Sequence, residues 1–197
     1  AAEAAALLAF ALLAQQDRVG AVLVTDAGVT ECRPARSRAS VMHFLQLLAS
    51  ANQALHADAP AGAPTSLDNV LESVARLARR DYLVIVLSDF DVIGARSEVL
   101  LSALCQHNDV VLAPVTDPLA EQLPDDLGQV VSDGTVQAWL DTGDARIRSA
   151  LDAVSQQRRE QLLQWQQRYG LSIAPLSAGE PTVAQLYRLL GVSRGRR

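Results

Sequence analysis

The sequence predicts an α/β protein of three layers, in which a mostly parallel, doubly wound sheet is covered by helices on both faces. Two observations lead to this fold class. Helical patterns alternate with strand-length runs along most of the chain, and the runs 82–88 and 109–118 are almost continuously apolar, as strands buried on both faces are. A chain of 197 residues that is 49% hydrophobic is long enough to bury such a core as a single domain, 1–197.

The first elements follow from periodicity and turn signals. Residues 1–16 read as an amphipathic helix, and the β-rich run 17–26 that follows is the first strand. The run 29–34 is a short antiparallel edge strand, which Pro34 stops because proline has no N–H to donate to a neighbouring strand. Apolar side chains at helical spacing then predict a helix over 40–57.

The central part of the chain begins with its clearest loop, 57–66. This loop ends in Thr65 and Ser66, whose hydroxyls are good N-caps for a helix over 67–80. The strand 82–88, a helix over 97–106 and the strand 109–118 come next, so the alternation continues through the middle of the chain.

The last third has a different pattern. A small hairpin insertion is expected at 129–142, with Asp133-Gly134 as its turn. A long helix over 144–169 follows and ends at Gly170, a good C-cap. Trp165 lies on the apolar face of this helix, so we expect it in the core. A strand over 171–177 and a closing helix complete the chain.

Composition excludes several classes of protein. The net charge is −5, and the 17 basic residues are all arginines, scattered except for the tail Arg194, Arg196 and Arg197, so the concentrated basic face of a nucleic-acid-binding protein is missing. No apolar stretch is long enough to cross a bilayer. Two distant cysteines without metal-ligand spacing fit a reducing, cytoplasmic compartment. The chain opens inside a helix without an initiator methionine, so we expect a fragment, and an upstream part could still associate with a membrane.

Two aspartates stand out in "LVIVLSDFDVI", because Asp89 and Asp91 follow a buried strand. The stretch resembles the motif of haloacid-dehalogenase-like phosphatases, in which the first carboxylate attacks phosphorus and the second protonates the leaving group. Such enzymes also need a basic residue for the phosphate. With no lysine in the chain, that residue would have to be an arginine, and the sequence does not identify it.

A metal-dependent binding site is the second interpretation. Ligands of parallel sheets gather at the carboxyl ends of the strands. Thr65 at a loop-to-helix junction and Asp89 at a strand end are oxygen ligands of the kind that Mg²⁺ prefers. For Asp26 and Asp117, which also end strands, a turn role is favoured, and for Asp91 a loop or cap role.

A family resemblance favours this second interpretation. It rests on weak segments in a consistent order, of which "D-P-L-x-x-x-L-P" (117–124) and "D-T-x-D-x-R" (141–146) are the most diagnostic. The chain resembles the C-terminal part of the von Willebrand factor A-like family called domain of unknown function fifty-eight, over nearly its whole length.

The resemblance implies a Rossmann-type sheet with a metal-ion-dependent adhesion site for Mg²⁺ or Mn²⁺. Thr65 matches the threonine of that site and Asp89 its aspartate. Its D-x-S-x-S motif is absent from this sequence, so the site is incomplete and the first, central strand is expected to be missing. Then 19–25 pairs directly with 82–88, or another chain fills the gap, or the preceding piece was lost from a folded protein.

The predicted function is therefore a non-enzymatic protein–protein interaction domain, with a phosphatase as the alternative. The resemblance implies a MoxR-type AAA+ ATPase as the partner, acting with this chain to assemble or activate client proteins. A homo-oligomer is a further association that the sequence allows.

Overall fold

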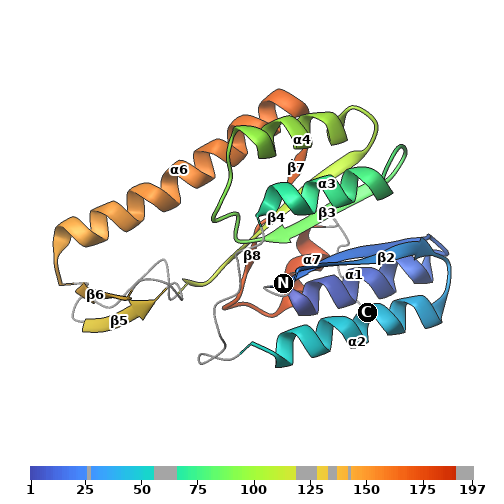
Figure 1. The fold of residues 1–197 in the computed structure, drawn as a ribbon, viewed down its shortest axis with the longest axis horizontal. Coiled ribbons are helices and arrows are strands. Elements are labelled where there is room, and N and C mark those ends of the chain that lie inside the picture. The colour runs from blue at the N-terminus through green and yellow to red at the C-terminus, as the bar shows by residue number, and fades with distance from the viewer. Residues whose placement is uncertain (26–27, 56–65, 119–127, 133–136, 142, 190–197) are drawn as a thin grey trace, which may run out of the picture.

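The computed structural model describes residues 1–25, 28–55, 66–118, 128–132, 137–141 and 143–189 (Figure 1). Helices and strands alternate through much of the chain, as predicted. In order, the elements are α1 (Ala2–Ala14), β1 (Val19–Thr25), β2 (Gly28–Ala35), α2 (Arg38–Gln53), α3 (Leu67–Leu77), β3 (Leu83–Ser88), α4 (Ala95–Cys105), β4 (Asp109–Thr116), β5 (Gly128–Ser132), β6 (Gln137–Asp141), α6 (Ala145–Tyr169), β7 (Ser172–Ile173), β8 (Leu176–Ser177) and α7 (Thr182–Leu189).

Strand β4 is the centre of a parallel sheet. It pairs with β3 along six residues, from Leu83↔Asp109 to Ser88↔Pro114, and with β7 and β8 on its other edge. The strand predicted over 171–177 is thus two short pieces. Pro175 separates them, because it has no N–H to continue the ladder.

Helices cover both faces of this sheet, which confirms the three-layer α/β architecture. One face packs against α3, α4 and α6, and the other against α1 and α7. The residues of the first core are Leu71, Ala78, Val84, Phe90, Leu101, Leu104, Val110, Leu112, Leu162, Trp165 and Leu171. Those of the second are Ala4, Ala113 and Leu176, with Leu87, Val115 and Leu186 packed against them. Alternate residues of β3 and β4 thus point into opposite layers, and both layers are apolar.

The strand β1 pairs with β2 as an antiparallel hairpin, so the predicted edge strand is present, but it continues through Pro34 and ends at Ala35, which pairs with Val19. Among the described residues β1 does not pair with β3, and the direct closure of 19–25 onto 82–88 is absent. The same helices nevertheless contact both sheets. Helix α1 packs on the hairpin through Ala9 and on the parallel sheet through Ala4, and α3 contacts both strands of the hairpin.

Two local expectations about burial need correction. Helix α1 is not sharply amphipathic: Ala4 and Ala9 are buried against different sheets, while Phe10 is exposed. Strand β3 is not buried throughout, because Leu83 is 52% exposed at its start. Helix α1 thus covers parts of two sheets, through Ala4 and Ala9.

Helix α6 is the longest element, and Figure 1 shows its first half projecting away from the sheet towards the β5–β6 hairpin. That hairpin is the insertion predicted at 129–142, paired from Gly128↔Asp141 to Ser132↔Gln137. Trp165, in the second half of α6, is 1% exposed in the core, as predicted. None of the helices in the described ranges is long and apolar enough to cross a membrane.

Candidate functional site

The loop after β3 carries both aspartates of the sequence motif. Asp89 and Asp91 are exposed at the carboxyl end of the strand, whereas Phe90 between them is 1% exposed and belongs to the core under α3, α4 and α6. The backbone turns here, so the Phe90 ring enters the core while the carboxylates on either side of it stay exposed. At Phe90 the angle φ is +55°, a left-handed conformation that costs a non-glycine residue about 1–2 kcal/mol.

Local hydrogen bonds fix this loop. The backbone N–H of Phe90 donates to Ser88 Oγ at 3.0 Å, and the N–H of Asp91 donates to Asp89 Oδ1 at 3.2 Å. The Ser88 hydroxyl also donates to Asp89 Oδ1 at 3.3 Å. One oxygen of the Asp89 carboxylate therefore holds the turn. The other, Oδ2, has no hydrogen bond within the part of the chain that the structure describes, and Asp89 as a residue is exposed.

Helix α6 contributes a side chain that the sequence did not identify. The guanidinium of Arg158 forms an ion pair with the carboxylate of Asp91, and its Nη1 donates to the backbone carbonyl of Asp89 at 3.3 Å. Asp91 lies in this loop, the kind of place expected for it, and its carboxylate also binds Arg158, 67 positions further along the chain. A signal was present, since Arg158 lies four and seven residues before Leu162 and Trp165, on their face of the helix.

The first turns of α3 and α4 lie side by side next to this loop. Asp68 accepts a hydrogen bond of 2.5 Å from the buried hydroxyl of Ser97, and Ser97 Oγ also accepts from the N–H of Gly94 at 3.3 Å. Arg96 forms an ion pair with Glu72 one turn further on. The start of α3 is thus held close to Gly94, where the Asp89 loop ends.

The remaining predicted ligands have different outcomes. Thr65 and Asp26 lie outside the described residues, while Ser66 does cap α3, accepting from the N–H of Asn69 at 3.4 Å. Asp117 follows β4 and is exposed. In the described ranges, no group of three or more histidine, cysteine or acidic side chains is placed to hold a metal ion. Asp89 on its own is one ligand and not a complete metal centre.

A comparison with protein-family models assigns the chain. The model described as "Protein of unknown function DUF58" matches residues 1–161, most of the chain. The chain belongs to this DUF58 family. The match includes the Asp89 loop and Arg158 but ends before the landmark at 169–177, so it is shorter than the expected resemblance. No curated protein and no solved structure matches the chain.

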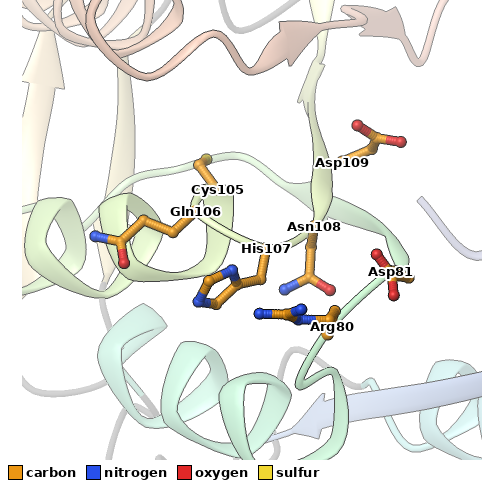
Figure 2. Close-up of a pocket in the computed structure, with 7 residues that line it drawn as sticks. All are labelled: Arg80, Asp81, Cys105, Gln106, His107, Asn108 and Asp109. Atoms are coloured by element: carbon orange, nitrogen blue, oxygen red, sulfur yellow. The ribbon is translucent and has the colours of Figure 1, made fainter.

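The opposite, amino-terminal edge of the sheet in this DUF58 protein carries an open polar hollow of about 430 Å³ (Figure 2). Cys105 and His107 line it, but burial raises the pKa of the Cys105 thiol, which disfavours the thiolate a nucleophile needs. Asn108 here joins three segments: its Oδ1 accepts from the Tyr82 N–H at 3.0 Å, and its Nδ2 donates to the carbonyls of Ala78 and Leu104 at 3.2 and 3.1 Å. Asn108 thus joins the end of α3, the start of β3 and the end of α4.

A second polar cluster fixes α6 against α4. Glu98 accepts hydrogen bonds from the hydroxyl of Tyr169 at 2.7 Å and from Arg168 at 2.9 Å. The Tyr169 hydrogen bond is the main cause that lowers the pKa of Glu98, with Arg168 adding to it, and the same bond raises the pKa of Tyr169. With Trp165 buried beside it, this cluster holds the C-terminal end of α6 against α4.

Proposed function

We propose that this chain is a non-enzymatic protein–protein interaction domain in which Asp89 is a ligand of a metal-ion-dependent adhesion site for Mg²⁺ or Mn²⁺. The observation that carries the proposal is the geometry of Asp89. Asp89 is exposed at the carboxyl end of a parallel strand, with one carboxylate oxygen anchoring the turn and the other, Oδ2, without a hydrogen bond among the described residues. Hard cations bind such oxygens and keep water or a partner's carboxylate in their other positions.

The adhesion site needs ligands from other loops. Thr65 is proposed as one of them because it matches the threonine of the adhesion site in the family resemblance, and it directly precedes Ser66, the N-cap of α3. The remaining ligands would come from the D-x-S-x-S loop of a von Willebrand factor A-like sheet. A strand carrying that loop would lie between β1 and β3, which do not pair with each other although α1 and α3 contact both sheets.

The proposed partner is a MoxR-type AAA+ ATPase, with which the domain would assemble or activate client proteins. A cation held by Asp89 would bridge the two proteins, so their association depends on the metal. The test is binding of the purified ATPase to the full-length protein in Mg²⁺ and in EDTA. We expect binding in Mg²⁺ that is lost with EDTA and with Asp89→Ala. Equal binding under all these conditions would contradict a metal-dependent interface.

A phosphatase is the second candidate, and one observation favours it. Arg158 supplies a basic residue at the Asp89 loop, which the phosphatase interpretation required and the sequence could not identify. Its guanidinium is, however, bonded to the Asp91 carboxylate and the Asp89 carbonyl. Release of p-nitrophenol from p-nitrophenyl phosphate, abolished by Asp89→Asn, would establish this alternative. The interaction domain releases none.

A further inference from the structure

A single side chain from α6 holds both ends of the Asp89–Asp91 turn. The guanidinium of Arg158 uses two different nitrogens, Nη2 for the Asp91 carboxylate and Nη1 for the Asp89 carbonyl. The side chain of Arg158 is 27% exposed, so it lies largely within the structure. An arginine fork that bonds two groups at once fixes their relative position better than a single bond does.

The turn needs such support because its central residue is strained. Phe90 has a positive φ, and a conformation of this kind persists only where the surroundings impose it. Burial of the Phe90 ring in the core is one constraint that maintains this backbone conformation. The bonds of Arg158 to Asp89 and Asp91, the residues before and after Phe90, are a second.

Arg158 also marks a boundary along α6. On its C-terminal side the helix is packed into the core through Leu162 and Trp165. On its N-terminal side the same helix face is open: Val154 is 56% exposed and Leu151 39% exposed. The change from exposed to buried apolar side chains along this face of α6 therefore falls at Arg158, between the half that projects in Figure 1 and the half that packs on the domain.

We propose that Arg158 is the positioning residue of Asp89 and that it makes the order of the Asp89 loop depend on the position of α6. Movement of the projecting half of α6 would pull on Arg158 first and would loosen the turn that presents Asp89. The part of this inference that concerns cation binding rests on the proposed function. The part that concerns the loop does not.

The first test measures loop order directly, by amide hydrogen exchange of Phe90 and Asp91 in NMR spectra. For Arg158→Gln we expect exchange about three- to tenfold faster at these two amides, from the loss of a partly exposed ion pair and a hydrogen bond. Arg158→Lys should lie between Arg158→Gln and wild type. Arg168→Gln is the matched control, since it also removes an ion pair between α6 and the body, and it should leave both amides unchanged.

Two results would overturn the loop inference: unchanged exchange in Arg158→Gln, or an equal acceleration in Arg168→Gln. This test does not require a bound metal, so it stands even if the adhesion site fails. Asp91→Asn removes the same ion pair from the other side and should accelerate the same two amides.

The second test separates positioning from charge. Removing the positive charge of Arg158 should, by electrostatics alone, tighten cation binding at Asp89. Positioning predicts the reverse, with Mn²⁺ bound about three- to tenfold more weakly by Arg158→Gln and partial recovery in Arg158→Lys. Tighter Mn²⁺ binding by Arg158→Gln would overturn the positioning of Asp89 for a cation. If the wild type binds no Mn²⁺, the proposed function fails, and the exchange experiment alone decides the loop inference.

Discussion

The strain at Phe90 predicts an inverted order of stability for two substitutions. Phe90 is 1% exposed in the core and has φ +55°. Either Phe90→Ala or Phe90→Gly removes the buried ring, which costs about 3–5 kcal/mol of the free energy of unfolding. In ordinary helix or strand backbone glycine is about 0.5–1 kcal/mol worse than alanine. Here alanine keeps the left-handed strain of about 1–2 kcal/mol, and glycine releases it.

We therefore expect Phe90→Gly to be more stable than Phe90→Ala by about 1 kcal/mol, equivalent to a melting temperature about 2–4 °C higher for a domain of this size. Urea unfolding followed by circular dichroism measures the difference. Phe44 is the control, since it is also buried but lies inside α2, so Phe44→Gly should be less stable than Phe44→Ala. The reasoning is refuted if Phe90→Gly is the less stable of the Phe90 pair.

Three further predictions concern stability. Glu98 has a lowered pKa in the folded state, so its stabilising contribution is present above the ordinary carboxyl pKa and is lost as pH falls through the lowered value; Glu98→Gln should flatten the acid limb of a pH–stability curve, and an unchanged limb would argue against this. Asn108→Ala removes three hydrogen bonds and should cost about 2–4 kcal/mol, measured by urea unfolding; a loss below about 0.5 kcal/mol would show that they are dispensable. Gly20→Ala would place its Cβ 2.8 Å from Pro34 Cγ and should destabilise the hairpin by about 1–3 kcal/mol. Gly94→Ala, whose Cβ would meet no atom within 4 Å beyond its chain neighbours, should lose only about 0.5–1 kcal/mol in thermal unfolding, because alanine is the poorer N-cap for α4.

Much of the fold could be predicted because local chemistry and tertiary structure agree. Gly170 ends α6 with φ +68°, as a C-cap glycine should. Ser66 begins α3, and Trp165 lies in the core on the face that its spacing indicated. In each case the deciding feature, a side chain or a missing Cβ, acts within one turn of the helix. The residues next to it in the sequence are therefore enough to predict the structure.

Other features depend on contacts between residues far apart in the chain, and the local sequence does not specify those contacts. The left-handed backbone of Phe90 results from burial of its ring under three helices, and a phenylalanine gives no hint of positive φ. The sequence left open whether the strand 19–25 pairs with the strand 82–88. It could not decide this, because strand pairing depends on which strand edges meet in the folded protein. Arg158 could have been noticed as a charged residue on an apolar helix face, but not its bond to Asp91.

The account depends most on Asp89 as a metal ligand, and calorimetric titration of Mg²⁺ and Mn²⁺ into the full-length protein tests this directly. Wild type should bind the cation, Asp89→Ala should not, and Asp109→Ala, which removes an exposed carboxylate at the opposite edge of the sheet, should bind as the wild type does. Absence of binding by the wild type, or equal binding by Asp89→Ala, would contradict the proposed adhesion site.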